Sequence, residues 1–283
     1  MLAIVGGLGA ALVFAAVTLC NSRSSRMIGP SQLLAWVMVI GLAITGPLVL
    51  ARGVPEGFDA EAAAWMAVAG IGNVVGLLLA YSALRMGKVG TVAPMVSTQG
   101  AIAGLIAIIA GEPVAADVAV LLVVIAIGIW LAAVPPEEVA APEARQAKRV
   151  TVYAMGAAVA IGWSLYAIGR VSIALPVVWA LLPSRVLGVL VVTLPLALRS
   201  GLRMTREALP LVLVAGVFEV AGFALFAFGA RHGIAVSAVL SSQFAAIAAI
   251  GAYVLFRERL SRVQLAGVAA IVVGVGALSG VQA

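Results

Sequence analysis

The sequence has few charged residues, and this scarcity excludes a soluble globular protein. Only 10% of its 283 residues are Asp, Glu, Lys or Arg, whereas 64% are hydrophobic. Soluble domains are about a quarter charged, so this chain cannot cover a water-exposed surface. Its apolar residues come in runs of about 20, the length at which a helix crosses about 30 Å of hydrocarbon. We therefore predict helical membrane spans, because backbone groups in lipid must pair within their own segment.

Cysteine and histidine are also scarce, and several motifs are absent. One Cys and one His exclude an intrachain disulfide and argue against a Cys/His metal site. The sequence has neither a G-x-x-x-x-G-K-[ST] phosphate loop nor an H-E-x-x-H zinc motif. We therefore expect no metal, no cofactor and no ATP hydrolysis by that route. The net charge is +6, but the basic residues lie in small groups between apolar runs, as in membrane loops, which argues against a nucleic-acid partner.

Clusters of Gly, Pro and charge separate ten predicted spans. They cover residues 2–20, 30–50, 62–84, 89–110, 115–134, 151–169, 176–198, 208–230, 233–256 and 261–281. The polar stretch 135–149 is the only long connection. We therefore predict an all-α integral membrane protein of ten transmembrane helices. Its parts are a five-helix unit at 1–134, a polar cytoplasmic linker at 135–150 and a second five-helix unit at 151–283.

Lys and Arg in the short connections are strongly biased to one side of the predicted membrane. That side holds Arg23, Arg26, Arg85, Lys88, Arg145, Lys148, Arg149, Arg199, Arg203, Arg206, Arg257, Arg259 and Arg262. The other side holds Arg52, Arg170 and Arg231. Because basic loops stay in the cytoplasm, both termini are predicted to be non-cytoplasmic in a multi-pass protein of the cell (inner or plasma) membrane.

The third to fifth predicted spans match the second half of the chain without gaps at an offset of 146 residues. Gly76 pairs with Gly222, Arg85 with Arg231, and Glu112 with Glu258. Ala, Gly and Val are common enough here to give chance identities, so the shared Arg-x-Gly and Glu are the stronger signal. An odd number of spans per unit makes the second copy enter the membrane from the opposite face. The sequence therefore predicts an inverted-topology repeat, an arrangement found in many secondary transporters.

The duplicated unit resembles the EamA repeat of the drug/metabolite transporter superfamily. The resemblance rests on "YSALRMGKVGTVAP" (81–94) with "GEPVAADVAVLLVVIAIGIWL" (111–131), and on "FAFGARHGIAVSA" (226–238) with "RERLSRVQLAGVAAIVVGVGAL" (257–278). It implies a carrier, not an enzyme, with a central cavity lined mainly by the first, third, fourth, sixth, eighth and ninth helices. It further implies transport of a small organic metabolite or drug-like molecule, as an exporter. Many relatives place their termini in the cytoplasm, which is the reverse of the orientation that the charge bias predicts.

One acid lies within an otherwise apolar span. Glu219 is flanked by Ala215, Gly216 and Gly222 on one helical face, and a charge at mid-membrane is costly enough that it usually faces protein or water. Arg185 is the only basic residue well inside a span. The two could form a structural ion pair. Alternatively, Glu219 could bind substrate or carry a proton, because burial favours its neutral form while a nearby arginine favours the carboxylate.

Further polar and aromatic residues near mid-span are candidates for the same central cavity. They are Asn73, which the repeat pairs with Glu219, and Gln99, Gln243, Ser241, Trp163 and Tyr166. Amides and hydroxyls could bind a solute or only join helices, and an aromatic ring could stack on an organic ligand or only pack. Glu112 and Glu258 are interpreted as carboxylates that complement helix N-termini.

The protein is predicted to be a monomeric secondary transporter that moves a small organic solute by alternating access in the lipid bilayer, with the hypothesis that Glu219 couples transport to protons. A membrane-embedded enzyme or a scaffold acting on lipid-linked substrates is the alternative. An enzyme of that kind would need a cluster of acids or histidines near one interface, and the sequence shows none. The substrate is not specified by the sequence.

Overall fold

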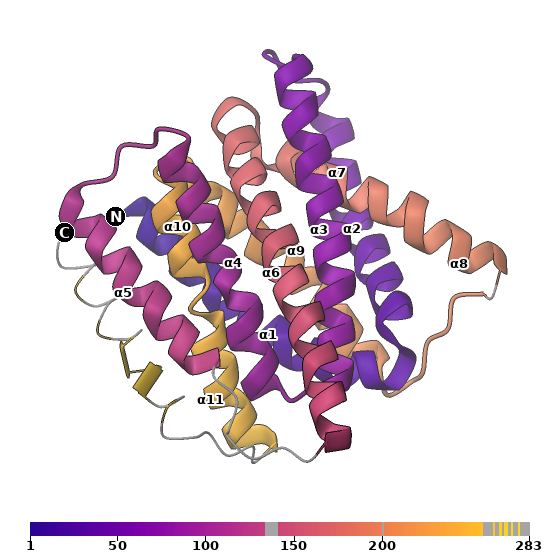
Figure 1. Cartoon of the computed structure of the whole chain (residues 1–283). Helices are drawn as coiled ribbons and strands as arrows, with labels where there is room; N and C mark the ends of the chain where they lie inside the picture. Colours follow the sequence, from indigo (N-terminus) through magenta and orange to yellow (C-terminus); the bar gives the residue numbers. More distant parts are fainter. Residues whose placement is uncertain are drawn as a thin grey trace.

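The structure is a computed structural model that describes residues 1–133, 141–199, 201–256 and scattered positions between 263 and 277. Its first half forms five helices (Figure 1). They are α1 (Leu2–Ile28), α2 (Pro30–Arg52), α3 (Ala60–Met86), α4 (Val89–Ile109) and α5 (Ala116–Ala133). Short connections join them: α1 passes into α2 through Gly29, whose φ of 87° lies in the region that favours glycine.

The described part of the second half contains helices that are interrupted at two places. It contains α6 (Ala141–Ala174), α7 (Val177–Gly188), the π-helical turn η1 (Val189–Thr193), α8 (Leu194–Arg199), α9 (Leu209–Ala230), α10 (Ile234–Ser241) and α11 (Phe244–Phe256). The segment from α7 to α8 is one candidate membrane span, and α10 with α11 is another, broken at Ser242 and Gln243. Within the described residues all regular structure is helical, and eight helices are long and apolar enough to cross a membrane.

The predicted spans from 2–20 to 233–256 each coincide with a helix or an interrupted helix. The tenth predicted span, 261–281, lies outside the described residues apart from isolated positions. Two boundaries differ from prediction. α1 continues eight residues beyond residue 20, because Asn21, Ser22, Ser24 and Ser25 are buried against other helices instead of facing water. Residues 141–150 of the predicted linker are the first turns of α6.

Helix contacts join the two halves in matching pairs. α3 packs against α6, and α9 packs against α1. The offset of 146 residues converts the first contact into the second. In the same way, α4 with α6 matches α10 and α11 with α1, and α2 with α9 matches α7 with α3. The contacts of α2 with α7 and of α4 with α10 and α11 map onto themselves. Two copies related by a twofold rotation would produce this pattern.

Glycines at equivalent positions allow the two principal contacts. A β-carbon at Gly76 on α3 would collide with Ile161 on α6. One at Gly222 on α9 would lie 2.5 Å from Phe14 Cε1 on α1. Both helix pairs therefore approach more closely than a larger residue would permit, as small residues allow in membranes.

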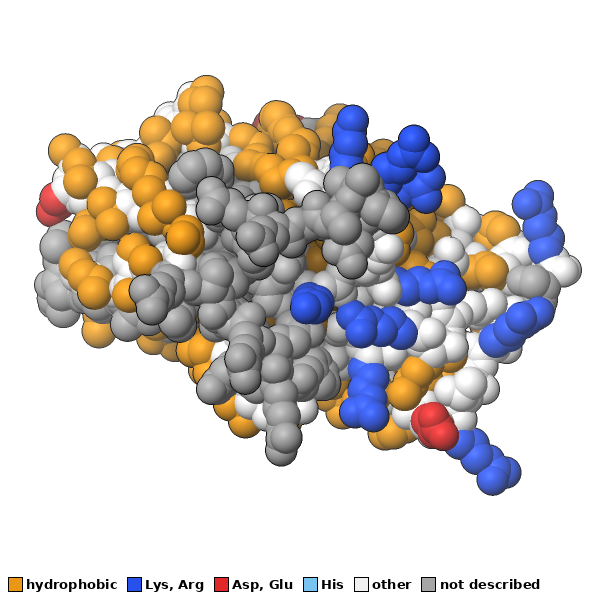
Figure 2. Space-filling view, turned by 60° about the horizontal axis from the view of Figure 1, so that its bottom comes forward, with side chains coloured by type: hydrophobic (Ala, Val, Ile, Leu, Met, Phe, Trp, Pro, Cys, Tyr) orange, Lys and Arg blue, Asp and Glu red, His pale blue; other side chains and the backbone are white. Residues whose placement is uncertain are grey.

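The two ends of the bundle differ in charge. Figure 2 looks onto the end that lies at the bottom of Figure 1, and Lys and Arg side chains spread over it. All ten described basic residues predicted for this end are exposed: Arg23, Arg26, Arg85, Lys88, Arg145, Lys148, Arg149, Arg199, Arg203 and Arg206. Arg52, Arg170 and Arg231 are also exposed and lie on the other side of the bundle, together with Glu56, Asp59 and Glu61. The remaining basic residues, Arg257, Arg259 and Arg262, lie outside the described part of the chain, as does Glu258.

Candidate functional site

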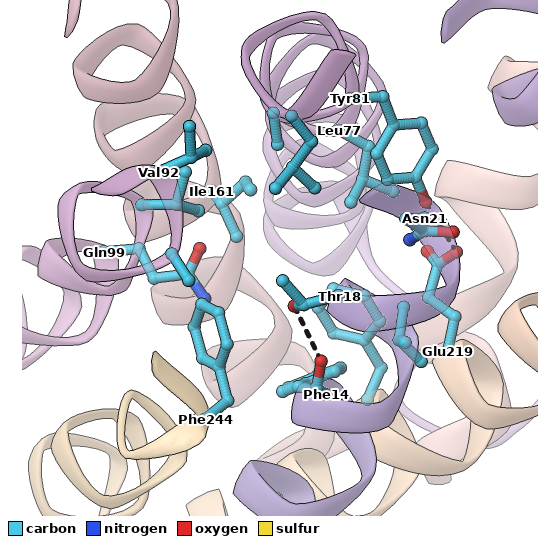
Figure 3. A pocket seen from close by; sticks show the side chains of 16 residues that line it. Phe14, Thr18, Asn21, Leu77, Tyr81, Val92, Gln99, Ile161, Glu219 and Phe244 are labelled. Carbon is cyan, nitrogen blue, oxygen red and sulfur yellow. Dashed lines mark hydrogen bonds between the residues drawn. The ribbon is translucent and has the colours of Figure 1, made fainter. Parts of the chain in front are cut away.

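A cavity of about 60 Å³ lies inside the bundle, where both halves meet. Helices α1, α3, α4, α6, α9 and α11 contribute to its wall. Figure 3 shows Asn21, Tyr81 and Glu219 gathered on one side and Gln99 with Phe244 on the opposite side. Most of the remaining wall is apolar, including Phe14, Leu77, Val92 and Ile161. A cavity of this size with polar groups on two sides of a largely apolar wall has room for water molecules.

Glu219 and Arg185 form the ion pair that the sequence left open as a structural alternative. Arg185 Nη1 donates to Glu219 Oε1 at 2.8 Å, and the side chains are 0% and 1% exposed. Glu219 also lines the cavity, whereas Arg185 does not belong to its wall. The carboxylate is therefore held on one side by α7 and faces the hollow on the other.

Tyr81 on α3 is the second polar contact of the carboxylate. Its hydroxyl lies 3.4 Å from Glu219 Oε2 and donates a long hydrogen bond. Asn21 of α1 lies beside both groups (Figure 3), and its Oδ1 has no hydrogen-bond partner within the described residues. Both carboxylate oxygens thus have a donor, and an unpaired amide oxygen lies next to them.

Side chains of α2 and α9 enclose Arg185. Its guanidinium carbon lies 5.8 Å from the centre of the Phe223 ring, a cation–π distance, and Nη1 also approaches Met38 Sδ at 3.7 Å. Gly41 on α2 leaves the space for the arginine, since a β-carbon there would lie 2.6 Å from Arg185 Cδ. Nε and Nη2 of Arg185 find no acceptor in the described part of the chain.

The predicted amides lie at different places around this centre. Gln99 lines the cavity, and its Oε1 is buried without a partner among the described residues. Asn73 is fully buried on α3, and neither atom of its amide is paired within the described ranges. Gln243 sits at the break between α10 and α11, where Nε2 donates to the Val239 carbonyl at 3.4 Å. Of the three, the structure places only Gln99 on the cavity wall.

Three other predicted cavity residues lie elsewhere. Trp163 is 45% exposed on the outer face of α6, because Ile161 and Leu165 occupy the inward positions of that turn. Tyr166 packs edge-on against Trp65, with ring centroids 5.4 Å apart, and lines a separate hollow beside Glu112 and Arg170. Ser241 is buried, but its hydroxyl donates to the Ala238 carbonyl of its own helix.

Sequence reasoning did not single out Tyr81 or Asn21. Tyr81 belongs to the quoted motif at 81–94, and its position two helical turns after Asn73 could have placed it on the same inward face. Asn21 was excluded because the first span was ended at residue 20, just before the polar stretch. The four aromatic and apolar residues Phe14, Phe223, Phe244 and Leu77 could not be separated from ordinary packing residues by sequence alone.

At the end of the bundle away from most of the basic residues, charged side chains bind helix termini. Both Glu112 oxygens accept from the Ala235 N–H at 3.2 Å, so this carboxylate caps α10 and does not begin its own helix. Burial raises the pKa of Glu112, although hydrogen bonds from backbone N–H groups of α10 act in the opposite direction. Arg231 donates to the Leu175 carbonyl at 2.8 Å and so caps α6. Glu112 thus links the first half to α10, and Arg231 links two helices of the second half, so both charges have structural partners outside the central cavity.

Part of this sequence matches the model of a protein family, and the fold matches that of a solved structure. Residues 1–134 match the model of the EamA-like transporter family. No curated protein matches the sequence. A solved structure described as "Crystal structure of protein" has a TM-score of 0.71 and covers 99% of this chain and 97% of its own, at 21% identity. At that identity the likeness shows a shared fold alone. The EamA-like transporter family, whose model matches residues 1–134, is part of the drug/metabolite transporter superfamily.

Proposed function

We propose that this protein is a secondary transporter that moves a small organic solute through the central cavity by alternating access. The observation that carries the proposal is the position of Glu219, a buried carboxylate on the wall of a hollow that both halves enclose. The matching contacts of α3 with α6 and of α9 with α1 support two inverted five-helix copies that rock against each other. The asymmetry of Lys and Arg supports a cytoplasmic location for the basic end.

The residues of the cavity wall also indicate the charge and polarity of the solute that would bind there. The charge of Glu219 on the wall is balanced by Arg185 directly behind it, so the cavity and its immediate surroundings carry no net charge in this conformation. Aromatic side chains of Phe14, Phe223 and Phe244 and the amide of Gln99 make up much of the rest. A solute with an apolar body, no net charge and at least one hydrogen-bonding group fits these surroundings best.

Proton coupling would act through the same carboxylate. A proton that reaches Glu219 from the cavity would neutralise it and weaken its bond to Arg185, which joins α7 to α9. Release of the proton on the other side would restore the pair. Coupling follows because the two states of the pair favour different arrangements of the helices that it links.

The experiment starts from a thermal-shift screen of the purified protein with amino acids, nucleosides and quaternary amines. The strongest hit, radiolabelled, is then followed into proteoliposomes with and without an imposed pH gradient. We expect gradient-driven uptake by the wild type, and uptake independent of the gradient by Glu219→Gln. Glu61→Gln, a change of an exposed carboxylate, is the matched control and should retain the gradient response. Retained gradient dependence in Glu219→Gln contradicts proton coupling at this residue, and absence of specific uptake by the wild type contradicts the carrier.

A further inference from the structure

A groove of about 700 Å³ lies on the outside of the bundle, between the end of α3 and the start of α6. Met86 contributes from α3, and Arg145, Lys148, Arg149, Val152 and Tyr153 contribute from α6. Gln146 fixes the two helices together at this point, because its Nε2 donates to the Met86 carbonyl at 3.0 Å. The groove is separate from the central cavity, with which it shares no residue.

The α6 side of the groove changes from basic to apolar along the helix. Arg145, Lys148, Arg149, Val152 and Tyr153 have the spacing i, i+3, i+4, i+7 and i+8, so they form one stripe. Its first three members are exposed cations at the basic end of the bundle (Figure 2). Its next members are apolar or aromatic and open to the surroundings, with Val152 62% exposed.

The same stripe continues toward the middle of the span. Val159 is 49% exposed and Trp163 is 45% exposed, and both follow the line of Val152 at a spacing of seven and eleven residues. An exposed apolar face at this depth contacts lipid tails. The outward position of Trp163, which excludes it from the cavity, thus makes it part of a lipid-facing surface.

The geometry points to a binding site for an anionic phospholipid. Its phosphodiester would lie among Arg145, Lys148 and Arg149, and an acyl chain would follow Val152, Val159 and Trp163. The order of polarity along the stripe is that of a phospholipid from headgroup to tail. Neither ion pair found in the described part of the chain involves these three cations, so their charge is open to a headgroup. Lys and Arg near a membrane surface each attract anionic lipid.

The competing explanation is that the cations only set membrane orientation, as basic loops do generally. A second group of basic residues in the same chain provides a control for this explanation. Arg199, Arg203 and Arg206 form a second exposed triplet at the same end, in and after the last turn of α8. None of the three lines the groove at α6. If the cations acted only through their general charge, the two triplets would contribute equally to lipid binding. If the groove is a specific site, the triplet on α6 contributes more.

The test uses the full chain in a neutral detergent and the two charge-matched variants R145Q/K148Q/R149Q and R199Q/R203Q/R206Q. Bound lipid is counted by native mass spectrometry, and melting temperature is followed during titration with phosphatidylglycerol, phosphatidylcholine or inorganic phosphate. We expect phosphatidylglycerol to bind and stabilise the wild type and the α8 variant. The α6 variant should bind phosphatidylglycerol about 100-fold more weakly, because it lacks three cations that each contribute about equally to the attraction of anionic lipid.

A third variant tests the apolar half of the stripe without changing charge. Val152→Asn should weaken phosphatidylglycerol binding several-fold, and because the residue is exposed the protein should fold as before. Equal losses in both triple variants would overturn the site, as would equal stabilisation by phosphatidylcholine. Stabilisation by inorganic phosphate to the same extent as by phosphatidylglycerol would show an anion site without a lipid, and would also contradict the proposal.

Discussion

Arg185 on α7 and Glu219 on α9 form a fully buried ion pair, with 2.8 Å between Nη1 and Oε1. Removing two charges from water has a large desolvation cost that their mutual attraction offsets only when the geometry is good. The pair joins two helices of the second half directly beside a hollow that both halves line. It is therefore both a structural link and the charged part of the candidate site.

The first prediction concerns the interdependence of these two charges. Glu219→Gln and Arg185→Met should each destabilise the protein by about 3–5 kcal/mol, because each leaves a buried group of the other residue uncompensated. The double variant should lose less than the sum of the two. Reversible unfolding in mixed micelles measures this coupling as a double-mutant cycle.

Glu61→Gln, which breaks the exposed pair with Arg170, should cost at most about 1 kcal/mol. Strictly additive losses for Arg185 and Glu219 would contradict the coupling.

The second prediction concerns the space for Arg185. Gly41→Ala would place a methyl group 2.6 Å from Arg185 Cδ, so the arginine must move away from its present position. We expect a loss of about 1–3 kcal/mol by overpacking, measured by the same unfolding method. Gly46→Ala on the same helix is the control, because its β-carbon would meet only Leu42 at 3.8 Å. That variant should be neutral or slightly stabilising, since Ala favours helix over Gly. Equal unfolding stabilities of the two alanine variants would contradict the close packing of Arg185 against Gly41.

The third prediction concerns Asn73, whose buried amide has no partner within the described residues. An unsatisfied buried polar group costs about 1–3 kcal/mol. Asn73→Leu, which has a similar branched shape, should therefore leave the melting temperature unchanged or raise it. We expect the same variant to transport more slowly if the amide serves another conformation of the cycle. A clear fall in melting temperature would mean that the amide is satisfied in the folded protein.

The fourth prediction tests alternating access at the end away from most of the basic residues. A β-carbon at Gly6 would lie 2.6 Å from the Cα of Gly229, and because the obstacle is backbone, α1 and α9 must separate. The cost of about 1–3 kcal/mol corresponds to a shift of roughly 5- to 150-fold toward a conformation open at that end.

The measurement for this shift is cysteine accessibility. In a Cys20→Ser background, Ser237→Cys places a thiol at a fully buried position beside Gly229. Gly6→Ala should accelerate its reaction with a membrane-impermeant maleimide. Gly9→Ala should not, because its β-carbon would meet only Leu225 Cδ1 at 3.4 Å. Unchanged labelling in Gly6→Ala would contradict a closed gate at this contact.

The fifth prediction is a pH dependence at Glu112. Burial raises the pKa of this carboxyl in the folded protein, so the folded state binds the proton more tightly than the unfolded chain. The resulting stability is complete below the usual Glu pKa of about 4.3 and is lost as pH rises through the raised folded value. Over that window the melting temperature of the wild type should fall relative to that of Glu112→Gln, whose amide oxygen can still accept from Ala235. Glu56→Gln, in the exposed loop before α3, is the control and should not diverge from the wild type. Parallel curves for the wild type and Glu112→Gln would contradict the prediction.

Hydrophobic runs and their breaks were sufficient to predict the eight helices that are long and apolar enough to cross a membrane in the described part of the chain, because a helix in lipid must satisfy its backbone locally and needs a minimum length. Gly76 and Gly222, which the offset of 146 residues pairs, each lie where a β-carbon would collide with a helix of the other half. The pairing of Glu219 with Arg185 was also one of the two predicted alternatives. Each of these features depends on composition or on one-dimensional spacing, which the sequence displays directly.

The tertiary structure decided which faces turn inward. Spacing alone could not show that Trp163 faces outward while Ile161 lies on the cavity wall, because the rotation of α6 depends on where α3 and α4 pack. Nor could it bring Tyr81 of α3 to Glu219 of α9, residues 138 positions apart. The sequence by itself determined that this chain crosses a membrane as helices with one costly acid among them. Only tertiary packing, within the second half for the arginine and between the halves for the tyrosine and the cavity, determined what this acid meets, because rotations and contacts between helices depend on surfaces that lie far apart along the chain.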